Sequence, residues 1–213
     1  KHVEVIPKQD IKIDYFLGEG FGASRLYKFK ITTNEGNIYE FGDVDGFEAI
    51  EYVQTPETFI NANGWYLRKI TSPDGKHNIT FSYEKEAFRQ RSRSTPIDSP
   101  DPSATIENQG GYSLSYSDIQ SLRLSQIKTT IETVTFEAGN ERNDIGYSLY
   151  KDMAKVAKTL NAIRIDNGTH CKRFRLFQSY FEDNTTYKSG GVGDFRLRLD
   201  SIQETSCTDT NIN

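Results

Sequence analysis

Alternation of apolar and polar residues is the dominant pattern along this chain. Two pairs of alternating runs flank turns that contain Gly36 and Gly75. Glycine supplies the positive φ that tight turns between paired strands require, so each pair of runs predicts a β-hairpin. The runs occupy residues 27–31, 39–41, 65–70, 79–83, 112–116, 133–136, 174–181 and 195–202.

A Leu-x-x-Ile step recurs within or beside these runs. It occurs at Leu67/Ile70, Leu124/Ile127, Leu160/Ile163 and Leu199/Ile202. Residues three apart point to opposite faces of a regular strand. Each step therefore predicts a β-bulge or bend at which the strand changes the face that it buries. The steps are unequally spaced, which favours a degenerate strand–turn–strand repeat over a strict solenoid.

Composition agrees with a β-rich chain. The 213 residues include 13 Phe and 12 Tyr but one Met and one Trp. Aromatic residues favour strands, whereas Met is among the good helix formers. We expect one all-β domain over residues 1–213. Its antiparallel β-hairpin array would form a large curved sheet or two packed sheets.

Two segments depart from the alternating pattern. Residues 86–111 are rich in Pro, Ser and Asp and carry Arg89, Arg91 and Arg93, which predicts a long flexible loop. A docking role for this basic cluster is the less favoured alternative. Residues 148–160 show apolar positions at helical spacing, which predicts one short amphipathic helix against an end of the sheet.

Charge and hydropathy exclude two classes of protein. The net charge is −4, whereas nucleic-acid-binding domains usually carry a basic excess, so we expect no nucleic-acid partner. No apolar run is long enough for a membrane span. The sequence begins at Lys1 without a leader, which we interpret as removal or omission of a signal peptide.

The two cysteines leave two alternatives open. Cys171 and Cys207 are too few for a disulfide-rich scaffold and lack zinc-ligand spacing. They could form one disulfide in an oxidising compartment, or remain two separate thiols. Sequence alone does not decide the pairing.

None of the candidate catalytic or metal-binding motifs is complete, and each is better explained as a structural feature. Leu17–Gly22 lacks the glycine spacing and the partner motifs of a kinase nucleotide loop. Gly42–Glu48 holds three carboxylates, but it is too short for an EF-hand and predicts an Asp-Gly turn. His170 and Cys171 are adjacent, so in a strand they would face opposite ways. We expect no catalytic residues, no cofactor and no metal.

Neighbouring aromatic residues are the remaining candidates for recognition. Trp65 with Tyr66, and Tyr15 with Phe16, place rings on both faces of their predicted strands. One ring of each pair could stack on a sugar. The favoured interpretation is that these rings cover a sheet face or contact a neighbouring domain.

Several of these segments resemble Rhs/YD-repeat proteins, especially the long secreted Rhs-like proteins of gut Bacteroidetes. The resemblance covers about residues 10–206 and depends on the order of short motifs. The motifs are Phe29–Gly42, Ala49–Tyr52, Trp65–Gly75, Asn78–Glu84, Gln178–Phe181 and Arg196–Ile202.

The resemblance implies that the chain is an N-terminal, pre-repeat region of such a protein. Its expected function is that of a non-enzymatic structural or interaction module, secreted or at the cell surface. Its expected partners are neighbouring domains of the same full-length chain, or a glycan or protein surface. The alternative is a carbohydrate-binding or carbohydrate-processing β domain that uses Trp65 or Tyr66.

Overall fold

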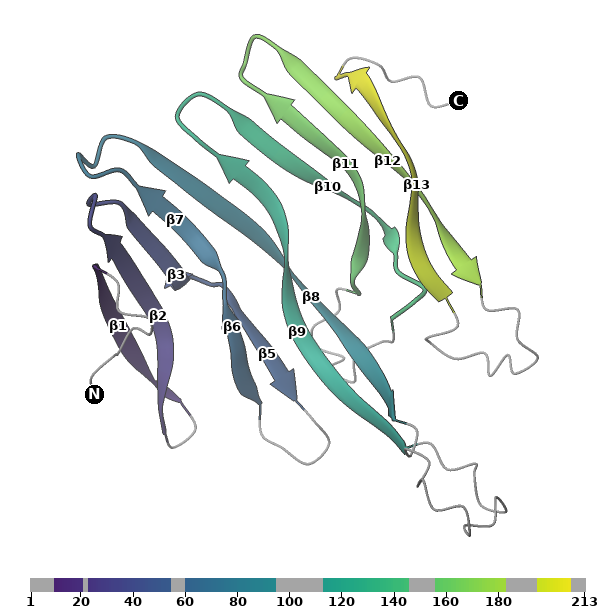
Figure 1. The fold of residues 1–213 in the computed structure, drawn as a ribbon, viewed down its shortest axis with the longest axis horizontal. Helices are drawn as coiled ribbons and strands as arrows, with labels where there is room; N and C mark the ends of the chain where they lie inside the picture. The colour runs from purple at the N-terminus through teal and green to yellow at the C-terminus, as the bar shows by residue number, and fades with distance from the viewer. Residues whose placement is uncertain are drawn as a thin grey trace, which may run out of the picture.

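The described part of the chain is all β and forms one large antiparallel sheet that stays open (Figure 1). The computed structural model describes residues 10–20, 23–54, 60–94, 113–145, 156–182 and 195–207. This architecture confirms the predicted all-β fold class. Of the two arrangements expected, the structure has the single sheet.

Consecutive strands mostly pair as hairpins. The main path through the sheet is β1-β2-β3-β7-β8-β9-β10-β11-β12-β13, while β4 pairs with β3, and β5 pairs with both β6 and β9. The strands are β1 (Ile11–Gly20), β2 (Ala23–Thr33), β3 (Ile38–Val44), β4 (Phe47–Glu48), β5 (Ile50–Gln54), β6 (Asn61–Trp65), β7 (Leu67–Thr71), β8 (Asn78–Ser94), β9 (Ser113–Lys128), β10 (Thr133–Glu141), β11 (Lys158–Asp166), β12 (Cys171–Glu182) and β13 (Phe195–Ser206).

Each predicted Leu-x-x-Ile step coincides with a β-bulge. In the β3–β7 pair, Phe41 lies opposite Leu67 and Glu40 lies opposite Lys69, so Arg68 is the extra residue. The register likewise leaves the residue after each of the other three leucines without a partner: Ser125, Asn161 and Asp200. A bulge bends its strand and increases the local twist. The predicted bends are therefore confirmed.

The long hairpin β8–β9 changes its neighbouring strands along its length. At the start of β8 and the end of β9, β8 pairs with β7 and β9 pairs with β10. Beyond the bulge at Ser125, β9 instead pairs with β5, and Ala87 of β8 bridges to Val156. Figure 1 shows β8 and β9 crossing between these two regions.

One face of the sheet carries a row of apolar side chains from β1 to β12. The register places on it Ile13, Ile31, Tyr39, Ile70, Ile79, Phe81, Ile127, Val134, Ile165, Phe136, Ile163 and Phe174. We call this row the apolar face. All of its members remain partly exposed. The opposite face carries ion pairs, among them Arg173–Glu137 at 2.6 Å.

The buried core is small and lies largely where the hairpins cross. The buried apolar residues of the described part are Val44, Ala49, Ile50, Tyr52, Ala87, Ile119, Leu122, Ala157 and Ala162. No large side chain among the described residues is fully buried. The crossing therefore holds the hairpins together, whereas both outer hairpins stay exposed.

The turns follow the sequence prediction. Gly36 and Gly75 adopt φ values of 87° and 69°, in the left-handed region where glycine carries no Cβ penalty. Between β3 and β4, Asp45 and Gly46 also have positive φ, at 55° and 76°. Two consecutive positive values are typical of a type I′ hairpin turn. The Gly42–Glu48 segment is thus an Asp-Gly turn, as predicted.

The expected boundary of the long loop at residue 86 is wrong. Residues 86–94 belong to β8 and pair with β9 in continuous register. Arg89 donates two hydrogen bonds to Asp118, at 2.7 and 3.1 Å, and the Asp118 side chain is 13% exposed. This cross-strand ion pair stabilises a polar stretch that lacks apolar alternation. Residues 95–111 of the predicted loop lie outside the described residues.

The helix expected over 148–160 is also wrong where the structure describes it. Residues 158–160 lie in β11, and Val156 makes an isolated bridge to β8. Residues 148–155 lie outside the described part. The described residues contain no helix that could cross a membrane.

Candidate functional site

The structure places Trp65 and Tyr66 in intramolecular contacts at the hairpin crossing. The Trp65 indole Nε1 donates to the carbonyl of Leu26 at 3.1 Å, and its ring meets Phe29 edge-on with centroids 6.3 Å apart. The Tyr66 ring meets Tyr83 edge-on at 5.3 Å. Both rings are half-buried. Both rings therefore make contacts within the sheet.

The other predicted pair does not join them in one exposed platform. Tyr15 lies opposite Phe29 across the β1–β2 pair, on the side of the apolar face. Phe16 is 47% exposed, and the Lys28 ammonium lies 5.0 Å from its ring centroid. Phe16 is therefore an exposed residue of the outer hairpin β1–β2.

A polar cluster that the sequence analysis missed lies beside Tyr66. The Tyr66 hydroxyl and the Ser121 hydroxyl both donate to Glu51 Oε2, at 3.0 and 2.8 Å, and Asn63 donates to Glu51 Oε1 at 2.9 Å. Three donors therefore converge on this one carboxylate. The cluster joins β5, β6 and β9. Its members come from separate strands, so no local pattern could have indicated it.

Glu86 lies next to this cluster in a less satisfied environment. It lies opposite Ser121 across β8–β9, and its side chain is 16% exposed. The backbone N–H of Lys158 donates to its carboxylate, but Oε2 has no hydrogen-bond partner in the described structure and lies 3.8 Å from Arg123 Nε. Burial raises the pKa of Glu86 above its usual value. Burial also raises the pKa of the Tyr66 hydroxyl.

Replacing Glu86 with Gln should stabilise the protein at neutral pH. A carboxyl whose pKa is raised on folding destabilises the folded state when it is ionised. The gain should therefore be present above the folded-state pKa, shrink as pH falls through it, and vanish below the unfolded-state value of about 4.3. Thermal unfolding of both proteins across pH measures the difference.

Glu132→Gln is the matched control, because it removes the same charge at an exposed turn position. It should change stability little at any pH. An equal effect of both substitutions would show that overall charge, and not burial of Glu86, is responsible.

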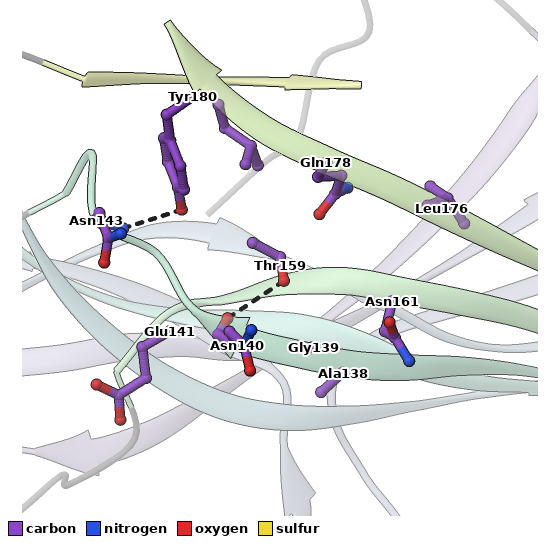
Figure 2. Close-up of a pocket in the computed structure, with 11 residues that line it drawn as sticks. Ala138, Gly139, Asn140, Glu141, Asn143, Thr159, Asn161, Leu176, Gln178 and Tyr180 are labelled. Carbon is purple, nitrogen blue, oxygen red and sulfur yellow. Dashed lines mark hydrogen bonds between the residues drawn. The ribbon is translucent and has the colours of Figure 1, made fainter. Parts of the chain in front are cut away.

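A polar groove of about 480 Å³ lies between the β10–β11 and β12–β13 hairpins (Figure 2). Pairing of β11 with β12 ends at Ala162 opposite Arg175. Beyond that point the bulges at Asn161 and Asp200 turn the two hairpins away from each other. The lining residues are Ala138, Gly139, Asn140, Glu141, Asn143, Thr159, Asn161, Leu176, Gln178, Tyr180 and Leu197.

The walls of this groove are fixed by close contacts. A Cβ on Gly139 would lie 2.4 Å from Thr159 Oγ1, so a larger residue there would require the Thr159 side chain to move. At one end the Asn143 backbone N–H donates to the Tyr180 hydroxyl at 3.0 Å (Figure 2). The Leu197 backbone N–H donates to Asp144 Oδ2 at 3.4 Å. These bonds link the two hairpins across the groove.

The remaining candidate residues are the two cysteines, His170 and the glycine-rich segment. Cys171 and Cys207 form a disulfide with a Cα–Cα distance of 5.7 Å, so of the two alternatives the structure has the bridge. His170 lies exposed in the turn between β11 and β12. Within the described ranges, no three His, Cys, Asp or Glu residues are grouped to hold a metal ion. Residues 17–20 of the glycine-rich segment lie in β1.

Comparison of the chain with protein-family models, with curated proteins and with solved structures finds no match.

Proposed function

We propose that this chain is a non-enzymatic structural module that packs against neighbouring β-structure in a larger assembly. The observation that carries the proposal is the exposure of the two outer hairpins. Most of the exposed large apolar residues of the described part lie there: Phe16, Leu17 and Tyr27 in β1–β2, and Phe177, Phe181, Leu199 and Ile202 in β12–β13.

Repeat arrays that end in solvent normally need polar capping units. Here Leu199 and Ile202 are 51% and 58% exposed on the last hairpin. The β13 strand also presents an edge that no described strand covers. An uncapped end of this kind suits addition of a further hairpin or a neighbouring domain.

The proposal also includes a family and a location for the protein. The sequence resembles Rhs/YD-repeat proteins, in which antiparallel hairpins build shells or cell-surface stalks, and an open hairpin array suits such a role. The Cys171–Cys207 disulfide supports a secreted or cell-surface location, because disulfides persist in oxidising compartments. The hydrogen bonds that occupy Glu51 support a structural use of the polar cluster at the crossing.

Self-association of the purified chain tests the proposal. With no neighbouring module present, the uncapped apolar hairpins should bind other copies, and sedimentation velocity should show association that increases with concentration. The Leu199→Glu/Ile202→Glu double variant should reduce it strongly, because charged groups resist burial in an apolar contact.

Ile131→Glu is the matched control. Ile131 is 79% exposed, but it lies in the turn between β9 and β10, away from the outer hairpins. It should leave association unchanged. A wild-type chain that stays monomeric at every concentration would overturn the proposal, as would equal effects of the two sets of substitutions.

A further inference from the structure

The groove between the β10–β11 and β12–β13 hairpins holds side-chain amides that make no hydrogen bond to the described residues. Asn161 and Gln178 are partly buried, and neither amide has a hydrogen-bond partner among the described residues. Asn140 and Asn143 add two exposed amides that likewise lack a side-chain partner there. Figure 2 shows Gln178 on β12 and Asn161 on β11, on opposite walls. Each amide offers two donors and one acceptor to a ligand.

The charge of the lining limits the class of ligand. Glu141 is the one charged side chain among the described residues that line the groove. Phosphates, nucleotides and acidic sugars are usually bound by Arg, Lys or backbone N–H clusters. The lining therefore favours a neutral ligand that both donates and accepts hydrogen bonds.

The groove also has apolar surface on one side. Leu176 and Leu197 line it next to Tyr180, whose ring meets Phe195 edge-on at 6.3 Å. Pyranose rings combine an apolar C–H face with a rim of hydroxyl groups. The leucines can contact the C–H face while the amides of Asn161 and Gln178 bond to the hydroxyls. The volume of about 480 Å³ lies within the usual range for ligand pockets.

We propose that this groove is a binding site for a neutral glycan, with Asn161 and Gln178 as its hydroxyl-binding residues. The site is separate from Trp65 and Tyr66 and does not depend on the structural role proposed above. An extended peptide suits the groove less well. The Asn143–Tyr180 and Asp144–Leu197 hydrogen bonds obstruct one end, where a paired strand would need to pass.

A glycan array followed by titration calorimetry tests the site. The purified chain should bind neutral oligosaccharides in preference to sialylated or sulfated ones. Asn161→Ala/Gln178→Ala should weaken binding to the best neutral oligosaccharide by about tenfold or more, because two hydrogen bonds are lost. Thermal unfolding of the variant shows whether the fold is kept.

Gln203→Ala is the matched control, since it removes an exposed amide from the same hairpin outside the groove. It should bind like the wild type. If the double variant unfolds, Gln178→Leu replaces it as the groove variant, because leucine keeps a similar side-chain volume and removes the amide. The proposal is overturned if no neutral oligosaccharide binds, if only acidic glycans bind, or if binding survives in the folded groove variants. A parallel peptide array that shows binding in place of sugars would also overturn it.

Discussion

Replacing Gly42 with Ala should destabilise the protein by about 2–5 kcal/mol, the sum of two costs. Gly42 has a φ of 83°, where an L-residue is strained by about 1–2 kcal/mol. A Cβ there would also lie 2.4 Å from the Tyr27 carbonyl oxygen and 3.0 Å from Trp65 Cδ1. The backbone must move to remove such an overlap, which costs about a further 1–3 kcal/mol.

The position of Gly42 makes that movement difficult. Its N–H donates to the Tyr66 carbonyl at 3.1 Å, and its own carbonyl accepts from Ala49 N–H at 3.3 Å. It also lies opposite Lys28 in the β2–β3 register. A shift at Gly42 therefore disturbs β2, the start of β5 and the junction of β6 and β7 together.

Gly46→Ala is the matched control. Gly46 has a similar φ of 76°, but a Cβ there would meet nothing within 4 Å. It should lose only the conformational part, about 1–2 kcal/mol. Urea unfolding of the two variants separates strain from steric overlap. Equal losses would show that the close approach at the crossing is absent in solution.

The bends of the sheet could be predicted because their cause is local. A bulge adds one residue to a period-two pattern, and the Leu-x-x-Ile steps record that shift directly in the sequence. A related spacing marks a fifth bulge, which was not predicted. Leu26 and Phe29 are also three residues apart, and the register leaves Tyr27 between them without a partner. The pattern that indicates a bulge is therefore Leu with any large apolar residue three positions later.

Residues 158–160 of the predicted helix form part of β11 for a reason that lies outside the segment. Leu160 lies opposite Ala138 and Lys158 lies opposite Glu141 in the pairing with β10. The spacing of apolar residues within one short segment does not record such a partner. The pattern alone does not separate a helix from a strand, whereas pairing of β11 with β10 does.

Neither the polar part of β8 nor the groove could be predicted from local patterns. Residues 86–94 pair with β9, and Arg89 bonds there to Asp118, a partner 29 positions away in the sequence. The groove amides come from β10, β11 and β12, and only the divergence of two hairpins brings them to one hollow. Both features depend on pairing between distant segments.

Removing the disulfide with Cys171→Ser/Cys207→Ser should cost about 3–4 kcal/mol, because the bridge closes a loop whose ends are 36 positions apart. The bridge joins the first residue of β12 to the residue after β13. Within the described sheet β13 pairs only with β12, so the loss should concentrate there. Hydrogen exchange should accelerate in β13 more than in β8 or β9, and the urea midpoint should fall.

Lys172→Ala is the matched control at the adjacent position. It removes the cross-strand ion pair between Lys172 and Glu204, whose atoms are 3.0 Å apart but whose side chains are 65% and 54% exposed. Exposed pairs of this kind contribute about 0–1 kcal/mol, so this variant should keep nearly the wild-type midpoint and exchange pattern. If the double serine variant matched it, β13 would be held by strand pairing alone. The covalent bond would then be dispensable for the last hairpin, whose exposed apolar residues carry the proposed assembly contact.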